Sequence, residues 1–169
     1  RFQSLSEHLG EMASLVTLRA DGTAIKKVPP SIVRLEKLEH LSLSKLKCSL
    51  QLPSLGGLRS LTSLILEDNN IEEVHNDIGS SLPCLVELRL DDNNFGSLPS
   101  LSGLSKLFIL SLNGCRTLVE ITDLPKSLGF LDMNDCYSLE RMPDLSGMST
   151  WVILFSPKLI EFPGLDSAL

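Results

Sequence analysis

Residues 107–115 read Leu-Phe-Ile-Leu-Ser-Leu-Asn-Gly-Cys, and the first six of them contain the template L-x-x-L-x-L that decides the fold. The template recurs along the chain, with Ala or Met in place of the last leucine in some copies. Its copies begin near residues 15, 38, 61, 85, 107, 128 and 148, at spacings of 23, 23, 24, 22, 21 and 20 residues. Such self-similarity is typical of a stacked repeat protein, in which each repeat buries its apolar face against its neighbours.

The template and its period predict the architecture of each repeat. A period of 20–29 residues with this template is that of leucine-rich repeats. The last two leucines alternate with period 2, which indicates a short strand with one buried face. Prolines recur in the return half of each repeat and exclude a long helix there. We therefore predict an α/β solenoid: a leucine-rich-repeat arc with a parallel concave β-sheet and a convex side of irregular segments, 3₁₀ turns and short helices. The longest helical candidates are Pro30–Leu35 and His75–Leu82.

A polar or sulfur residue recurs three positions after the third template residue. An Asn there can hydrogen-bond the backbone of the turn that leaves the strand and can form a ladder with its neighbours, whereas Cys or Thr makes weaker bonds. The second repeat has Leu46 there, or shifts to Cys48, which predicts an irregular turn. The residues at this ladder position are Thr23, Asn69, Asn93, Cys115, Cys136 and Ser156.

The seventh repeat allows two registers. One begins at Trp151 with Leu154 next, and the other begins at Met148 and places Trp151 and Ile153 at the second and third template positions. We prefer the second register, because it aligns residues 156–159 with the segments that begin at the cysteines of the two preceding repeats.

The repeats account for the whole chain, so we expect residues 1–169 to form a single leucine-rich-repeat domain of about seven repeats. Residues 1–14 read as the convex half of a preceding repeat, with Leu5, Leu9 and Met12 as its apolar positions. Terminal repeats usually carry a polar cap. Neither end of this chain has one, so we expect it to be a segment of a longer array.

Charge and cysteine usage exclude several classes of partner. The chain has 15 Lys and Arg against 21 Asp and Glu, and no basic stripe, which disfavours nucleic acid and anionic membrane surfaces. No apolar run approaches the roughly 20 residues that span a bilayer. The four cysteines lie in no CxxC or Cys/His cluster, so no metal site is expected. The absence of an Asn-x-Ser/Thr sequon favours a reducing, intracellular compartment.

The sequence shows no catalytic constellation. Of three histidines only His40 falls on a predicted strand, beside Glu39, and we interpret it as a solvated residue at the rim. Neither a Ser-His-Asp arrangement nor a phosphate-binding loop is present. We expect no catalytic residues and no cofactors. Cys115 and Cys136 occupy equivalent positions, and we expect two reduced, buried thiols because stacked parallel side chains rarely meet disulfide geometry.

The candidate binding surface is the concave face, because strand residues that alternate with the buried template residues must point there. One feature of it is an acidic strip, which is either ordinary solvation of the strand ends or a dock for a basic partner. The other is an apolar set, which indicates an interface unless a following segment covers it. The acidic strip comprises Asp21, Glu67, Asp68, Asp91, Asp92, Asp132 and Asp135, and the apolar set comprises Phe108, Ile109, Phe130, Val152, Leu154 and Phe155.

From this face we select fifteen candidate residues for partner binding. They are Arg19, His40, Ile65, Glu67, Asp68, Glu87, Arg89, Asp91, Asp92, Phe108, Ile109, Phe130, Asp132, Val152 and Phe155.

Several phrases resemble those of a known family. They are DGTAI at 21–25, VPPSI at 28–32, LNGCRTL at 112–118, LPKSL at 124–128 and NDCYSL at 134–139. They are similar to the repeat region of plant nucleotide-binding leucine-rich-repeat disease-resistance proteins. The DGTAI phrase and the C-x-x-L phrases indicate the subclass with an N-terminal Toll/interleukin-receptor-like (TIR) domain.

This resemblance implies a function in plant immunity. Repeats of that family recognise pathogen effectors or guarded host proteins, and they hold the nucleotide-binding domain of the parent chain in its resting state, in the cytoplasm or the nucleus. Nucleotide binding and any NAD cleavage belong to other domains. One alternative is a cell-surface receptor ectodomain, whose repeats usually carry an L-x-G-x-I-P phrase that is absent here. Another is a scaffold leucine-rich-repeat protein.

Overall fold

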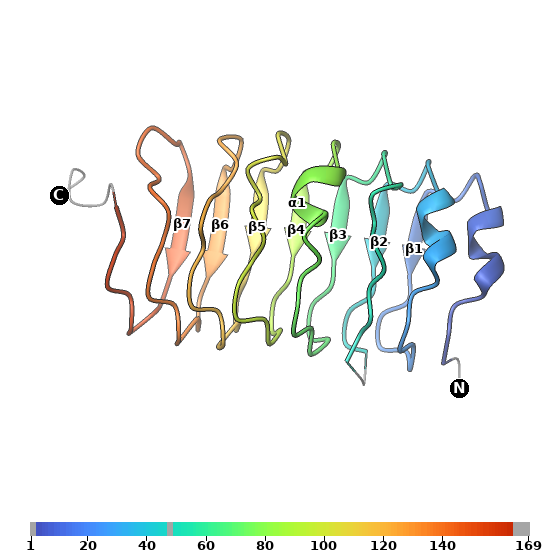
Figure 1. Cartoon of the computed structure of the whole chain (residues 1–169), viewed down its shortest axis with the longest axis horizontal. Helices are drawn as coiled ribbons and strands as arrows, with labels where there is room; N and C mark the ends of the chain where they lie inside the picture. The colour runs from blue at the N-terminus through green and yellow to red at the C-terminus, as the bar shows by residue number, and fades with distance from the viewer. Residues whose placement is uncertain (1–2, 47–48, 164–169) are drawn as a thin grey trace.

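The computed structural model describes residues 3–46 and 49–163. Seven short parallel strands form one sheet, and their order in the sheet is their order in the chain (Figure 1). The return segments with their short helices form the opposite face. The strands are β1 (Thr17–Arg19), β2 (His40–Ser42), β3 (Ser63–Ile65), β4 (Glu87–Arg89), β5 (Ile109–Ser111), β6 (Phe130–Met133) and β7 (Trp151–Leu154). The predicted solenoid with a parallel sheet is confirmed.

One continuous hydrophobic core runs between the sheet and the return segments. The second template leucine of each repeat pairs with the same leucine of the next, from Leu18 through Leu41 to Leu131. From β2 to β6 these leucines are at most 1 % exposed. Burying one leucine stabilises the fold by roughly 1.5–3 kcal/mol. Because the same leucine packing recurs in every repeat, neighbouring strands are held in one register.

Within residues 3–46 and 49–163, the convex side carries three short helical segments. They are the 3₁₀ helices η1 (Glu7–Glu11) and η2 (Pro30–Arg34), and α1 (Ile78–Ser81). Both predicted helical segments are confirmed, although each is shorter than its candidate range. η1 lies within the segment interpreted as the half of a preceding repeat, and there the Ser6 side chain accepts a hydrogen bond from the His8 N–H as an N-cap.

The predicted ladder forms at the turns that leave the strands. The side-chain amide of Asn93 donates to the carbonyl oxygens of Leu66 and Leu90, both at 2.9 Å. Its side-chain oxygen accepts the backbone N–H groups of Asn69 and Ile71, at 3.2 and 3.0 Å. Asn93 is fully buried. One asparagine therefore joins two successive repeats.

The cysteines continue this ladder. The thiol of Cys115 donates to the Leu90 carbonyl oxygen at 3.2 Å, and that of Cys136 donates to the Leu112 carbonyl oxygen at 3.1 Å. Both thiols are free and buried, as expected. Leu46 occupies the ladder position of the second repeat: its side chain is buried, and its N–H donates to the Asn69 side-chain oxygen at 2.9 Å. The alternative at Cys48 lies outside the described residues.

The register preferred for the seventh repeat is wrong. Leu131 of β6 pairs with Val152, and Met133 pairs with Leu154. Val152 and Leu154 therefore take the inward positions and pack against the core, while Trp151 and Ile153 point outward and are 80 % and 43 % exposed. The alternative register that begins at Trp151 is wrong for the same reason.

The alignment of residues 156–159 with the two cysteine segments is confirmed on the return side, where Glu120 forms a β-bridge with Arg141 and Arg141 in turn forms one with Glu161. Ser156 nevertheless does not make the predicted ladder bond. Its hydroxyl donates to the carbonyl oxygen of Leu139 on a return segment, not to a carbonyl at the end of a strand.

Candidate functional site

The strand register arranges the concave side chains in rows that cross the sheet. Each repeat presents three outward positions, two on the strand and one just after it. Because the strands are in register, equivalent positions of successive repeats lie side by side and form three rows. The first row is Thr17, His40, Ser63, Glu87, Ile109, Phe130 and Trp151. The second row is Arg19, Ser42, Ile65, Arg89, Ser111, Asp132 and Ile153. The third row, two residues further along, is Asp21, Ser44, Glu67, Asp91, Asn113, Asn134 and Phe155.

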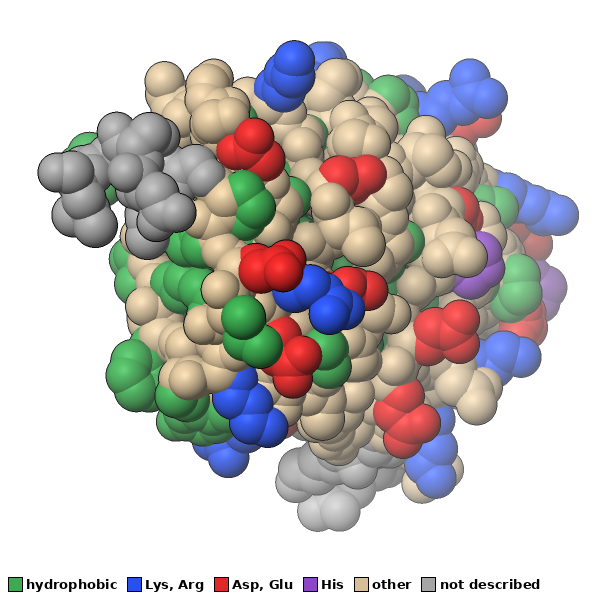
Figure 2. All heavy atoms as spheres, turned by 60° about the vertical axis from the view of Figure 1, so that its left-hand side comes forward, with side chains coloured by type: hydrophobic (Ala, Val, Ile, Leu, Met, Phe, Trp, Pro, Cys, Tyr) green, Lys and Arg blue, Asp and Glu red, His purple; other side chains and the backbone are tan. Residues whose placement is uncertain are grey.

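The rows change from polar to apolar toward β7. Phe108, which precedes β5, is 53 % exposed, and Phe155, which follows β7, is 57 % exposed. Figure 2 looks onto the carboxyl-terminal end and the return segments; hydrophobic side chains gather at the β7 end, and charged side chains are spread over the rest of the visible surface. We call these outward residues the apolar patch: Phe108, Ile109, Phe130, Trp151, Ile153 and Phe155.

The apolar patch differs from the predicted apolar set at β7. The prediction that Val152 and Leu154 lie on the concave face is wrong: both lie inward, because the strand register places them opposite buried residues of β6. Trp151 and Ile153 take their place on the surface. Sequence reasoning misses Trp151 as a site residue, although a tryptophan is itself a frequent anchor of interfaces.

A glycine positions the Phe108 ring on the sheet. A Cβ atom added at Gly129 would lie 2.1 Å from the Phe108 Cε2 atom and 2.3 Å from Cζ. The ring therefore lies directly on the backbone of the next repeat and needs the absence of a side chain there. This contact places the Phe108 ring beside Phe130 of β6, which follows Gly129 in the chain.

Phe155 closes the patch at the carboxyl end of β7. Its ring packs edge-on against Tyr137 with centroids 6.3 Å apart. The guanidinium of Arg116 lies over the Tyr137 ring, 5.7 Å from its centroid. Tyr137 also donates its hydroxyl to Asp135 at 2.7 Å. These contacts hold aromatic groups at the rim with little freedom to turn away.

Two members of the acidic strip support the next strand. Asp21 accepts the Ser42 hydroxyl at 2.6 Å and the Ser44 N–H at 2.7 Å. Asp91 repeats this geometry, with the Ser111 hydroxyl at 2.6 Å and the Asn113 N–H at 2.7 Å. Burial raises the pKa of Asp91 above its usual value, although these bonds oppose the shift.

Three other members of the strip belong to the turns. Asp68, Asp92 and Asp135 have positive φ angles of 54°, 53° and 59°, two residues after the third template position. Gly22 and Gly114 occupy the equivalent places with φ of 67° and 68°. Asp tolerates this left-handed conformation better than most side chains. These aspartates are therefore explained by the turn, and their carboxylates remain exposed at the rim.

Charged residues meet at the centre of the concave face. Arg89 donates from Nε to the Glu87 carboxylate at 2.7 Å, and its Nη1 lies 4.0 Å from Glu67. Burial raises the pKa of Glu87, but hydrogen bonds from Arg89 and Ser63 outweigh it and hold that pKa below its usual value. Burial and the neighbouring Asp91 raise the pKa of Glu67. The Arg89 guanidinium thus forms ion pairs with the carboxylates of both Glu87 and Glu67.

This charged group lines a hollow of about 310 Å³ on the concave face. Of the other predicted residues, Ile65 is half-buried in its wall, whereas Arg19 and His40 are exposed on β1 and β2 and do not line it. The hollow is lined by Asp21, Ser42, Ser44, Lys45, Ile65, Glu67, Glu87 and Arg89.

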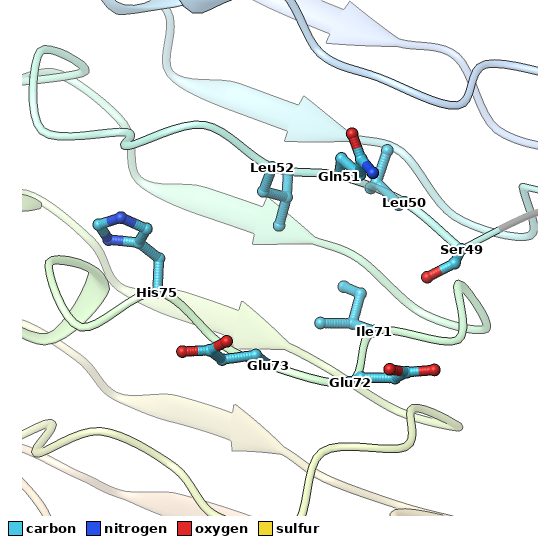
Figure 3. Close-up of a pocket in the computed structure, with 8 residues that line it drawn as sticks. All are labelled: Ser49, Leu50, Gln51, Leu52, Ile71, Glu72, Glu73 and His75. Carbon is cyan, nitrogen blue, oxygen red and sulfur yellow. The ribbon is translucent and has the colours of Figure 1, made fainter.

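A second hollow of about 440 Å³ lies between two return segments. Figure 3 shows residues 49–52 on one segment and 71–75 on the next. His75 is paired with Asp77 at 2.7 Å, and Glu72 and Glu73 are exposed. These groups do not converge on a point where a substrate would react. Among the described residues no cluster of three metal-binding side chains occurs, and no helix in that part of the chain could cross a membrane.

Comparison with known proteins supports the repeat assignment. The leucine rich repeat family matches residues 59–116. TMV resistance protein N of Nicotiana glutinosa is 35 % identical over 143 residues, which are 81 % of this chain and 12 % of that protein. Receptor-like kinase TMK2 of Arabidopsis thaliana is 29 % identical over 140 residues, covering 81 % of this chain and 14 % of the relative. The resemblance to the repeat region of plant disease-resistance proteins is confirmed.

The fold also matches a solved structure. An LRR protein of Leptospira interrogans superposes with a TM-score of 0.67 at 23 % identity, over 83 % of this chain and 40 % of that protein. This likeness concerns the fold alone. The chain spans about an eighth of the length of the curated relatives it matches.

Proposed function

We propose that this chain, which belongs to the leucine-rich-repeat proteins, is a protein-recognition module that binds its partner through the concave face. The observation that carries the proposal is the apolar patch. Trp151, Phe108 and Phe155 are each more than half exposed on a rigid sheet. Contiguous exposed apolar surface marks interaction sites, and Trp is enriched among residues that dominate binding energy.

The similarity to disease-resistance proteins supports a finer assignment. We infer that the module senses a pathogen effector or a guarded host protein in a plant immune receptor of the TIR-type nucleotide-binding class. It contacts the nucleotide-binding domain of the parent chain to keep the receptor at rest, in the cytoplasm or the nucleus. It needs no cofactor and binds neither nucleic acid nor membrane. The fifteen predicted partner-binding residues stay a prediction, with Trp151 and Ile153 added and Val152 removed.

The similarity to a receptor-like kinase supports a second candidate, the ectodomain of a cell-surface receptor. The open reading frame around this segment distinguishes the two. A G-x-x-x-x-G-K-[ST] phosphate loop upstream supports the intracellular receptor. A signal peptide upstream with a membrane span downstream supports the surface receptor and contradicts the intracellular one.

Binding measurements with matched variants test the recognition function. Wild-type chain, Trp151→Asp, Phe130→Asp and the control Ile160→Asp are immobilised and exposed to purified pathogen effectors and candidate host proteins. Ile160 is 78 % exposed but lies outside the sheet. Its replacement by Asp therefore removes an exposed apolar side chain, as the patch variants do, but leaves the concave face unchanged. Circular dichroism confirms that each variant is folded.

A true partner should bind wild type and Ile160→Asp equally. Loss of an interfacial Trp costs about 2 kcal/mol or more, so affinity for Trp151→Asp should fall roughly 30-fold. A partner whose affinity is the same for both patch variants as for wild type would contradict the proposal.

A further inference from the structure

We propose that the concave face selects a partner segment that presents an apolar side chain and a basic side chain together, the apolar one over Phe130 and Trp151 and the Lys or Arg at Asp91 and Asp132. This inference rests on the proposed function and specifies the chemistry of the partner. It follows from how apolar and acidic residues are placed relative to each other on β4 to β7.

The apolar and acidic surfaces are parallel and adjacent. Ile109, Phe130 and Trp151 are consecutive in the first row and form an apolar ridge across β5 to β7. Asp91 and Asp132 lie in the third and second rows, toward the carboxyl ends of the strands. A partner that covers the ridge therefore lies beside the two carboxylates.

Negative charge is in excess beside the ridge. The outward rows of β3 to β6 carry four carboxylates, Glu67, Glu87, Asp91 and Asp132, against one cation, Arg89. The Arg89 guanidinium already forms ion pairs within the sheet: its Nε lies 2.7 Å from the Glu87 carboxylate, and its Nη1 lies 4.0 Å from the Glu67 carboxylate. A cation from a partner would relieve the remaining repulsion, whereas an acidic group would add to it.

Asp132 is available to such a cation. Its two carboxylate oxygens accept the Asn113 and Asn134 side-chain amides at 2.9 and 3.2 Å, and the residue is only half-buried. Each carboxylate oxygen can accept two hydrogen bonds, so acceptor capacity remains. Asp91 and Asp132 also repel each other, since each carries negative charge within electrostatic reach of the other. A Lys or Arg between them would be attracted to both carboxylates and would reduce their mutual repulsion.

The spacing sets the geometry of the partner. Phe130 and Asp132 are two residues apart on one strand, and therefore about 6.6 Å apart along it. An extended segment matches this distance with residues i and i+2, and a helix matches it with residues i and i+3 or i+4. The partner segment thus carries its apolar and basic residues two to four positions apart.

Peptide selection tests this chemistry even though the partner is unidentified. A phage library of random 12-residue peptides is selected on the full 169-residue chain, and enriched sequences are synthesised together with versions in which each Lys or Arg is replaced by Gln. Binding is measured at 50 and 500 mM NaCl to wild type, Trp151→Asp, Asp132→Asn and the control Asp144→Asn. Asp144 is an exposed carboxylate outside the sheet, bonded only within its own turn to Ser146.

The proposal expects peptides with an aromatic or aliphatic residue two to four positions from a Lys or Arg. Their affinity should fall at least 10-fold with the Gln replacement, with Asp132→Asn, with Trp151→Asp and at high salt, and should be unchanged with Asp144→Asn. The Gln replacement and the salt series leave the protein unaltered, so they remain decisive if Asp132→Asn folds poorly.

Other outcomes separate this inference from the proposed function. Peptides that lose binding in Trp151→Asp but are indifferent to salt and to the Gln replacement overturn the basic preference and leave concave-face recognition standing. Peptides that bind Trp151→Asp as well as wild type overturn both. A library that yields no enriched sequence also overturns the inference, because the face then selects no short segment.

Discussion

Replacing Asn93 by Ala should remove a large share of the stability of the solenoid. Asn93 makes more hydrogen bonds than any other ladder residue that the structure describes. Its amide donates to the carbonyl oxygens of Leu66, Leu90 and Asp91, and its oxygen accepts the N–H groups of Asn69 and Ile71. An Ala side chain can neither donate nor accept, so all five backbone groups lose this partner.

The magnitude follows from the two N–H groups. Each buried N–H without an acceptor costs about 1–3 kcal/mol, so the loss should be about 2–6 kcal/mol. A domain of this size has a free energy of unfolding of about 5–15 kcal/mol. Asn93→Cys should lose about half as much, because the Cys115 thiol at the equivalent position donates to a strand-end carbonyl and accepts the Asn93 N–H.

Urea unfolding followed by circular dichroism measures these differences through the shift of the midpoint at constant slope. Asn94→Ala is the matched control. Asn94 is the neighbouring residue, and its side chain makes only an exposed bond to Asn70 at 3.1 Å, so its loss should stay within about 0.5 kcal/mol. If Asn93→Ala were as stable as Asn94→Ala, the ladder would not carry the stability assigned to it.

Three further predictions concern thiols, pH and the patch. Cys115 and Cys136, whose pKa values burial raises to about 12 and about 11, should be alkylated at pH 8 only after unfolding, as mass spectrometry of modified peptides would show. Because burial raises the pKa of folded Asp91 above the usual 3.8, the contribution of Asp91 to the free energy of unfolding increases as the pH falls through the folded pKa toward about 4. Asp91→Asn should lose part of that gain in urea unfolding at several pH values, and an unchanged pH profile would contradict the assignment. Gly129→Ala should displace the Phe108 ring and weaken partner binding while circular dichroism stays unchanged; equal affinity would show that the ring is not part of the interface.

The repeat period and the ladder can be predicted because each depends on contacts that recur. A leucine that stacks on the same leucine of the next repeat leaves a periodic signal, and so does an Asn that must satisfy the same turn. Sequence reasoning therefore predicts Asn69 and Asn93 with their role. It does not predict the hydrogen bonds that Asp21 and Asp91 accept from the next repeat. These bonds require a serine at one particular position of the following repeat, and the sequence of a single repeat does not show that requirement.

The roles within the acidic strip cannot be separated by residue type alone. Asp91 and Asp92 are neighbours in sequence, yet one accepts bonds from the next repeat and the other adopts a left-handed turn. Which role a carboxylate has depends on backbone direction at the strand end. The sequence pattern therefore places Asp21, Glu67, Asp91 and Asp132 in the outward rows as expected, but it does not separate them from Asp68, Asp92 and Asp135, which belong to the turns at the rim.

The register of β7 links the packing of the core to the proposed binding surface. A slip of one residue exchanges inward and outward side chains of a strand, so either Trp151 or Val152 must face the core. The inward row is filled by leucines from β2 to β6, and an indole there would overpack it, whereas Val152 and Leu154 fit. Core packing thus fixes the register and forces Trp151 outward, but it does not explain why that outward residue is a tryptophan, since a polar side chain would serve the fold better in water. The partner proposed for the concave face supplies a reason, because covering Trp151 would remove its apolar surface from water.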